Sequence, residues 1–361
     1  MEPKVSNMAT DNQIKVAIAG VGNCCQAFVE GLEYYRRNPD DTRGLMNVDI
    51  GGFKVTDIVP VAAFDINQEK VGKDLNEAIF SEPNMAYRYG LDLEPSGVTV
   101  QMGPVLDGNP PNLGVTASEA EPRNVAEALS SSGAEMLLNF IPTESHDAAR
   151  FYADASIKES KIGFINGMPT LIVCDPAYQK AAVESGVPII GDDVKSQLGG
   201  TAIHRALATL FDTRGVHMPE TYQLNFGGNT DFANLQARGE SKLKTKKESV
   251  TSLMPYPVNM STGFSYIPLM KDRKTAIFWI NGGNFGNTPL HFEGKLEVED
   301  SANFAGVIVD MVRYTRIALD RGVSGALNSA CSFLTKHPPE KIRDMDAFEH
   351  LKEVVAGSRE R

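Results

Sequence analysis

Lysines near acidic residues are the side chains of this sequence best suited to chemistry on a charged substrate. A basic run, SKLKTKKESV, covers 241–250, while Lys274 closes a KDRK stretch and Lys336 precedes HPP. A lysine can bind a phosphate, polarise a carbonyl, or move a proton when burial lowers its pKa. Taken alone, the basic run and Lys336 are more typical of solvated loops. The acids that end apolar or glycine-rich segments are Asp193, Asp231 and Asp300.

A glycine turn near the N-terminus is the second feature with chemical potential. The apolar run IKVAIAG (14–20) is followed by the turn VGN (21–23) and by a helical pattern over 24–35. A strand, a glycine turn and a helix together present backbone N–H groups and a helix dipole to a dinucleotide pyrophosphate. Cys25 replaces the third glycine of the G-x-G-x-x-G fingerprint, so a purely structural turn is the alternative.

An acid at the end of the next apolar run bears on the choice of cofactor. The run IVPVAAF (58–64) ends in Asp65, which is placed to accept hydrogen bonds from an adenosine ribose. Asp65 lies farther from Gly20 than the about 20 residues of the generic fingerprint. A carboxylate here favours NAD over NADP, since it would repel a 2′-phosphate. The predicted NAD contacts are therefore Gly20, Val21, Gly22, Asn23, Cys24 and Asp65.

The remaining cysteines and histidines form no recognisable site. The four cysteines show neither metal-ligand spacing nor a disulfide framework, and we expect buried thiols. Adjacent Cys24 and Cys25 would react in an oxidising compartment, which favours the cytoplasm. His204 and His291 are more typical of structural or surface histidines. The sequence leaves a metal site unknown and a requirement for a monovalent or divalent cation open.

The elements that must position these residues change character near residue 216. Short apolar runs alternate with helical patterns before that point, which is the signature of a parallel sheet with helices on both faces. These runs cover 14–20, 58–64, 136–141, 162–165 and 187–190. Later strand-like segments are separated by long polar connections, which predicts an α+β unit with an antiparallel or mixed sheet. They cover 222–226, 276–280 and 290–298, and an amphipathic helix follows over 305–318.

Length and charge exclude several classes of protein. The chain has 361 residues, which favours two domains. With 35 basic and 46 acidic residues the net charge is −11, which argues against a nucleic-acid partner. No apolar stretch approaches the about 20 residues of a membrane span, so no membrane partner is expected. Residues 1–13 lack the apolar core of a signal peptide and form a polar tail.

Eight segments in a fixed order resemble the myo-inositol-1-phosphate synthase family in its shorter prokaryotic form. They are VAIAGVGNC (16–24), VAAFDINQEKVGKDL (61–75), GDDVKSQ (191–197), NFGGNTDF (225–232), SKLKTK (241–246), DRK (272–274), LEVEDSANFAGVIVD (296–310) and TKHPP (335–339). The similarity extends over 14–339, nearly the whole chain. Eight ordered segments are far more specific than one G-x-G turn.

The resemblance implies an α/β fold, a Rossmann-like doubly wound parallel sheet with an inserted α+β domain for catalysis and oligomerisation. The NAD-binding domain would cover 14–215, after the polar tail of 1–13. The inserted domain would cover 216–304, and the C-terminal segment, 305–361, would complete the NAD-binding domain. The family also implies a cytoplasmic homotetramer with a hexose phosphate substrate.

The chemistry implied by the resemblance is an isomerising ring closure. D-glucose 6-phosphate would become 1D-myo-inositol 3-phosphate through C5 oxidation, enolisation, intramolecular aldol closure and C5 re-reduction, with NAD recycled. The enolate and alkoxide need fixed cations, and the phosphate needs a cationic pocket. The implied catalytic residues are Lys242, Lys246, Lys274, Lys336, Asp193, Asp231 and Asp300. Further implied cofactor contacts are Asn139, Asp193, Ser196, Asp300 and Ser301.

The resemblance also suggests how the lysines divide the work. Lys242 and Lys246 would serve the aldehyde oxygen and the phosphate. Lys274 would stabilise the enolate, and Lys336 would move the C5 hydroxyl proton.

Three local departures from the family pattern leave the substrate open. They are NFIPT (139–143), NGMP (166–169) and the Gly- and Asn-rich INGGNFGN (280–287). The run of Lys244, Lys246 and Lys247 is a further departure, since it is denser than usual. One alternative is a related cyclase that closes another hexose phosphate, such as fructose 6-phosphate, into a different ring. A plain NAD-dependent dehydrogenase and a non-catalytic NAD-binding protein are the others.

Overall fold

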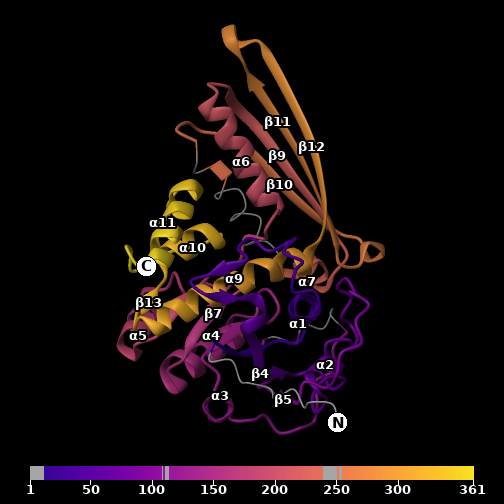
Figure 1. The fold of residues 1–361 in the computed structure, drawn as a ribbon. Coiled ribbons are helices and arrows are strands. Elements are labelled where there is room, and N and C mark those ends of the chain that lie inside the picture. The colour runs from indigo at the N-terminus through magenta and orange to yellow at the C-terminus, as the bar shows by residue number, and fades with distance from the viewer. Residues whose placement is uncertain (1–11, 108, 110–113, 239–249, 252–253) are drawn as a thin grey trace.

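A seven-stranded parallel sheet forms the base of the molecule (Figure 1). The computed structural model describes residues 12–107, 109, 114–238, 250–251 and 254–361. The strand order is β13-β8-β7-β6-β1-β4-β5, with every adjacent pair parallel. The strands are β1 (Ile14–Ala19), β4 (Ile58–Asp65), β5 (Val100–Met102), β6 (Met136–Asn139), β7 (Gly163–Asn166), β8 (Pro188–Ile190) and β13 (Gly325–Ala326). This is the doubly wound order, and its direction reverses between β1 and β6.

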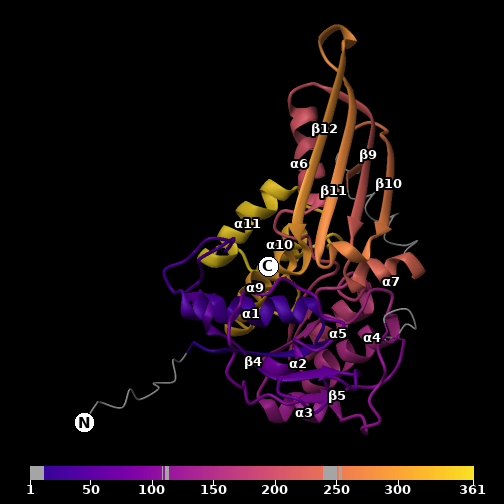
Figure 2. The ribbon, with the colours of Figure 1, turned by 90° about the vertical axis from the view of Figure 1, so that its right-hand side faces the viewer.

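Helices cover both faces of this sheet, because its strands are apolar on both sides. In β1, all residues except Lys15 are buried, as a central parallel strand requires. α1 (Asn23–Arg37) and α9 (Asp300–Asp320) pack against each other on one face (Figure 2). The opposite face carries α3 (Val125–Ser132), α4 (His146–Asp154) with its π-helical continuation Ala155–Ser160, and α5 (Pro176–Ser185).

A mixed four-stranded sheet stands above the first. Its order is β10-β9-β11-β12, with β10 and β9 parallel and the other pairs antiparallel. The strands are β9 (His217–Gly227), β10 (Asn259–Tyr266), β11 (Arg273–Gly283) and β12 (Pro289–Glu299). α6 (Gly200–Thr213) packs on one face of this sheet, and α7 (Thr230–Arg238) lies at its base (Figure 1).

The C-terminal part of the chain returns to the first sheet. α9 follows β12 directly, and β13 then extends the parallel sheet at its edge beside β8. α10 (Asn328–Leu334) and α11 (Asp344–Ala356) pack together after it. We keep the division into 14–215, 216–304 and 305–361 as a proposal. α9 begins at Asp300, so its first turn lies before the proposed boundary.

The predicted fold class is confirmed, whereas several short elements were not predicted. β5, β10 and β13 escaped the sequence analysis because they are short or interrupted by polar residues and glycine. The predicted helix 305–318 starts five residues earlier, at Asp300, where the acid occupies the first helical turn. None of the described helices has the length and hydropathy to cross a bilayer.

His204, on the buried side of α6, links that helix to the second sheet. Its Nε2 lies 2.8 Å from Thr221 Oγ1, and its ring meets Phe278 edge-on. His204 is fully buried, and burial lowers its pKa to about 4. The burial of His204 agrees with the structural alternative in the prediction of a structural or surface histidine.

The buried imidazole predicts an acid-sensitive fold. In the unfolded chain His204 would titrate near its ordinary pKa of about 6.5, so the unfolded state gains a proton first as the pH falls. Stability should therefore be lost between about pH 6.5 and 4, by ~3 kcal/mol in total. Denaturant unfolding of His204→Gln at a series of pH values should show a weaker loss. The exposed His291→Gln variant is the control, and an unchanged slope in His204→Gln would contradict the assignment.

Candidate active site

One large cleft lies between the two sheets, at the carboxyl ends of the parallel strands. It encloses about 1720 Å³, part of it open to solvent. Its floor is the point between β1 and β6 where the strand order reverses, which is where ligands bind in open α/β sheets. Its opposite wall comes from β9, β11 and the start of α9. Both halves of the chain thus contribute to a single site.

The glycine turn forms the part of the cleft suited to an anion. Gly20 has φ of +96°, and a Cβ there would lie 2.8 Å from the backbone carbonyl of Phe140, so only glycine fits. Gly22 is the N-cap of α1, where no side chain caps the helix and no acid occupies the first turn. A Cβ on Gly22 would meet nothing within 4 Å. The first residues of α1, Asn23 and Cys24, line the cleft together with Gly22, which suits the binding of an anion at a helix N-terminus.

Asp65 holds this turn from the end of β4. Its Oδ2 accepts a hydrogen bond from the backbone N–H of Val21 at 2.7 Å. Its Oδ1 accepts two more from the amides of Ile66 and Asn67, each at 2.8 Å. Asp65 still lines the cleft, where it was predicted to meet an adenosine ribose, and its carboxylate also orders the glycine turn.

Lys70, which the sequence analysis did not single out, binds the same turn from the other side. Its Nζ donates to the carbonyl of Val21 at 2.7 Å and to Asn84 Oδ1 at 2.9 Å. Lys70 is only 3% exposed, and burial lowers its pKa. The Val21 peptide is thus held through its N–H by Asp65 and through its carbonyl by Lys70. The only sequence signal was its place in the FDINQEKVGKDL segment, five residues after Asp65.

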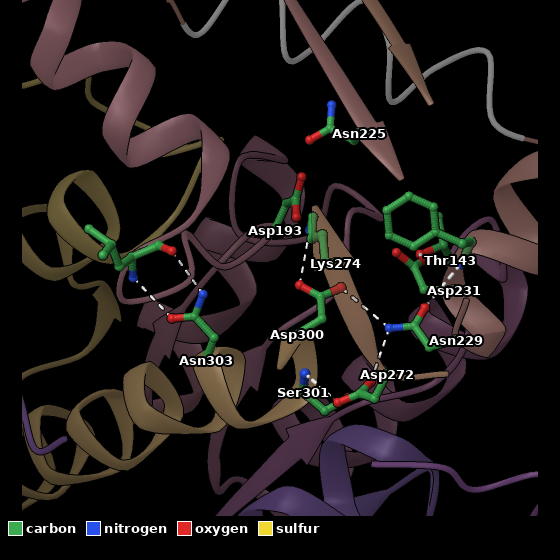
Figure 3. A network of polar contacts seen from close by, with 12 residues as sticks. Thr143, Asp193, Asn225, Asn229, Asp231, Asp272, Lys274, Asp300, Ser301 and Asn303 are labelled. Atoms are coloured by element: carbon green, nitrogen blue, oxygen red, sulfur yellow. Dashed lines mark hydrogen bonds and ion pairs between the residues drawn. The ribbon is translucent and has the colours of Figure 1, made fainter. Parts of the chain in front are cut away.

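Lys274 and Asp300 form an ion pair across the cleft wall (Figure 3). Lys274 Nζ, from the start of β11, lies 3.0 Å from Asp300 Oδ1 at the N-terminus of α9. Asn229 Nδ2 approaches the other oxygen of Asp300 at 3.4 Å. These contacts orient the ammonium group in the cleft.

Asp272 lies behind this pair and was also missed. It is 1% exposed and accepts hydrogen bonds from the backbone N–H of Ser301 at 3.0 Å, from its hydroxyl at 2.7 Å, and from Asn229 at 3.1 Å. Burial, together with the charge of Asp300, raises the pKa of Asp272 to about 7. The quoted DRK segment contains it, but nothing in the sequence signals its burial.

The start of α7 adds polar groups to the same wall. Asp231 Oδ1 accepts the hydroxyl of Thr143 at 2.6 Å, which ties the insert to the loop after β6. Asn225, from β9, lies above Asp193 and Lys274 in Figure 3. Asn225 and Asn229 are further site residues that the sequence analysis did not single out, although both lie in the NFGGNTDF segment.

The C-terminal segment contributes Lys336 to the same cleft. Lys336 Nζ pairs with Asp193 Oδ1 at 2.6 Å. The backbone of Lys336 also donates to the Asp193 carbonyl at 2.7 Å, and that of Lys195 donates to Leu334 at 2.8 Å. A short antiparallel contact between 192–195 and 334–337 therefore positions the lysine.

Most of the predicted site residues that the structure describes meet in this cleft. Those that line it are Gly20, Gly22, Asn23, Cys24, Asp65, Asp193, Ser196, Asp231, Lys274, Asp300, Ser301 and Lys336. Val21 and Asn139 lie behind the surface, and the Asn139 amide donates to Asn166 Oδ1 at 2.9 Å. Lys242 and Lys246 fall outside the described residues. Within the described part of the chain, no three His, Cys, Asp or Glu side chains cluster as a metal site.

Comparison with known proteins finds relatives from one enzyme family. Residues 199–301 match the family model described as myo-inositol-1-phosphate synthase. The chain is 42% identical to inositol-3-phosphate synthase of Mycolicibacterium smegmatis, over 96% of this chain and 98% of the relative. It is 43% identical to the enzyme of that name from Corynebacterium glutamicum, over 95% of this chain and 98% of the relative.

Solved structures agree on the fold. The crystal structure of Ari2 superposes with a TM-score of 0.80 at 34% identity, over 96% of this chain and 99% of that one. A myo-inositol-1-phosphate synthase-related protein from Thermotoga maritima gives a TM-score of 0.77, over 95% of this chain and 98% of that one. At 23% identity, the second likeness speaks for the fold alone.

Proposed function

This chain belongs to the myo-inositol-1-phosphate synthase family, and on that premise we propose that it converts D-glucose 6-phosphate to 1D-myo-inositol 3-phosphate. Substrate and product are isomers, so any oxidation within the turnover must be reversed. The observation that carries the proposal is one cleft that holds both an anion-binding glycine turn and two lysine–aspartate pairs. That combination suits a redox cofactor next to a phosphorylated substrate with developing negative charge.

The glycine turn fits NAD. The N-terminal amides of α1 would bind the pyrophosphate, with Lys70 buried beneath the turn. Asp65 would accept hydrogen bonds from the adenosine ribose, and its charge would disfavour NADP. When bound, NAD supplies a hydride acceptor for C5 of the sugar and returns the hydride after ring closure. The groups toward the nicotinamide end would be Asp193, Ser196, Asp300 and Ser301, with Val21 and Asn139 supporting them from behind.

Lys336 is the proposed proton carrier for the C5 hydroxyl. Its Nζ would accept the hydroxyl proton as C5 becomes a ketone and donate it again as the alcohol re-forms. Asp193, 2.6 Å from that nitrogen, would hold the ammonium in place while it carries the proton. The ketone acidifies C6, and this carbon then attacks the C1 aldehyde.

Lys274 is the proposed stabiliser of the enolate. Asp300 orients its ammonium group, and a fixed cation stabilises charge that appears only in the transition state. Lys242 and Lys246 remain proposed for the aldehyde oxygen and the phosphate. Asp231, hydrogen-bonded to Thr143, would orient the lysines on its side of the cleft.

The four cysteines support a reducing location. All of them are free thiols, and burial raises the pKa of Cys25 and Cys331 well above the ordinary value. We retain the cytoplasm as the proposed location.

Product identity tests the proposed function directly. The protein is incubated with glucose 6-phosphate and catalytic NAD+, and in a second reaction with fructose 6-phosphate. NMR should show inositol phosphate from the first substrate and no ring closure from the second. A carbocycle formed only from fructose 6-phosphate would replace the proposed function with the sister cyclase. Release of stoichiometric NADH would show that the protein is a plain NAD-dependent dehydrogenase.

The cofactor assignment predicts separate losses for Asp65 and Lys70. Asp65→Ala and Lys70→Met should each weaken NAD binding in calorimetry by ~1–3 kcal/mol, because each leaves the Val21 peptide partly unpaired. Glu69→Ala, an exposed neighbour, is the matched control and should bind normally. Equal affinity of the native protein for NAD and NADP would contradict the role of Asp65.

The proposed roles of Lys336 and Lys274 predict that their alanine variants, neither of which forms product, stop at different steps of the reaction. Lys336→Ala should block the first oxidation, so no reduced nicotinamide absorbance appears. Lys274→Ala should allow some oxidation and then stall, so that absorbance accumulates on the enzyme. Lys180→Ala, an exposed lysine of α5, is the control. Full cyclase activity in either cleft variant would show that these roles are wrong.

The face of the second sheet opposite α6, on which no described helix packs, predicts a homotetramer. Tyr222 and Trp279 stack in parallel, 5.4 Å apart. Their chain neighbours Thr221 and Phe278 contact His204 of α6, so the alternation of side chains along a strand puts the stacked pair on the face opposite α6. Figure 2 looks toward the edge of the sheet on that side.

The aromatic pair forms an apolar strip on this face, while the β12 edge carries Glu293 and Lys295, which lie opposite Trp279 and Ile277. A second subunit would cover the strip. Light scattering at micromolar concentration should give four times the chain mass, and Trp279→Lys should lower it. A monomer for the native chain would contradict the prediction.

A further inference from the structure

A cluster of three charged side chains holds the loop that carries Lys336. The proposed reaction assigns no role to this cluster. Lys195 Nζ lies 3.0 Å from Asp344 Oδ1, the first residue of α11. Arg205, from α6, makes a two-pronged contact with the same carboxylate, at 2.9 and 3.1 Å. The cluster joins the loop after β8, helix α6 and the C-terminal helix.

These charges are largely removed from solvent. The side chains of Lys195 and Arg205 are 9% and 12% exposed, and that of Asp344 is 35% exposed. Burial lowers the pKa of Lys195 to about 8, and the charge of Asp344 opposes that shift. The charges of Arg205 and Lys336 act in the same direction as burial. Lys336 is thus coupled electrically to the cluster.

The cluster also closes the base of the Lys336 loop. Lys195 Nζ donates to the carbonyl of Ser332 at 2.6 Å. The Ser332 hydroxyl donates to the carbonyl of Glu340 and accepts the N–H of Ile342, both at 2.8 Å. Ser332 precedes the loop, and Asp344 follows it. Both ends of the segment 335–343 are therefore tied to Lys195.

We propose that Asp344, through Lys195 and Arg205, is a positioning residue that sets the place and the proton affinity of Lys336. The inference rests on the proposed function, because it assumes that Lys336 moves a proton. Asp344 lies outside the cleft lining and touches no reacting atom.

The charges around Lys336 determine the direction of the effect. Asp193 faces it directly at 2.6 Å, and Lys195, Arg205 and Asp344 form the layer behind. Removing the charge of Asp344 leaves two buried cations uncompensated, which favours neutral Lys336. Removing the charge of Arg205 does the opposite. By Coulomb's law at the effective dielectric constant of a partly buried region, a unit charge in the layer behind a titrating group shifts its pKa by roughly half a unit or more.

The pH dependence of turnover measures the electrostatic coupling between Lys336 and the cluster. If neutral Lys336 starts the reaction, the acidic limb of the kcat–pH profile follows its pKa. In Asp344→Asn this limb should move to lower pH by about half a unit or more, and kcat should fall about tenfold as the loop loosens. In Arg205→Gln the limb should move to higher pH. A merely structural role cannot produce shifts of opposite sign.

Two further variants serve as controls. Asp346→Asn alters an acid in the same first turn of α11, but Asp346 pairs with exposed Arg343, so its profile should match the native one. Asp344→Glu keeps the charge and should keep the native limb.

Each outcome decides the inference. Opposite shifts in Asp344→Asn and Arg205→Gln support it, and profiles identical to that of Asp346→Asn overturn it. If Asp344→Asn does not fold by circular dichroism, Arg205→Gln decides alone, with an upward shift in support and an unmoved limb against. Native protein that forms no inositol phosphate removes the proposed function and the inference together. If the native protein forms inositol phosphate but the acidic limb does not move in Asp344→Asn or Arg205→Gln, only the inference fails.

Discussion

The cleft depends on ion pairs between segments that are far apart in the chain. Lys336 meets Asp193, and Lys274 meets Asp300, so each lysine that the structure describes in the reactive region of the cleft has an acid from another element beside it. A buried cation without such a partner would lose its charge or destabilise the fold. The Lys336–Asp193 pair also binds the C-terminal segment to the loop after β8 of the first sheet, and the Lys274–Asp300 pair joins β11 to the start of α9.

A second constraint is the concentration of negative charge around α9. Asp272 and Asp300 lie close enough for the charge of one to raise the pKa of the other. The amides and hydroxyl groups of Ser301 and Asn229 offset this repulsion, and Lys274 neutralises one of the two acids. The arrangement holds polar groups rigidly at the cleft wall, which lets them act on a substrate without reorganising.

The glycine turn shows which features a local sequence pattern can predict and which it cannot. The strand, the turn and α1 were predicted from the run of apolar residues and two glycines, and the structure confirms them because their geometry depends on neighbours in sequence. Lys70 was not predicted, since its contact with the Val21 carbonyl arises only when the chain folds back over the turn. The same limit applies to Asp272, whose neighbours in sequence are charged but whose side chain is buried.

The sequence by itself determined the alternation that builds the parallel sheet, the change of pattern near residue 216 and the family to which the segments belong. Periodicity and turn residues act over a few positions, so they can be read without a fold. Only the tertiary structure decided that Asp193 meets Lys336 across 143 positions, and that Asn139 turns away from the cleft to bind Asn166. It also decided how Asp344 joins Lys195 and Arg205. Burial and charge partners are properties of the packed chain, and they determine which of many lysines and acids are able to react.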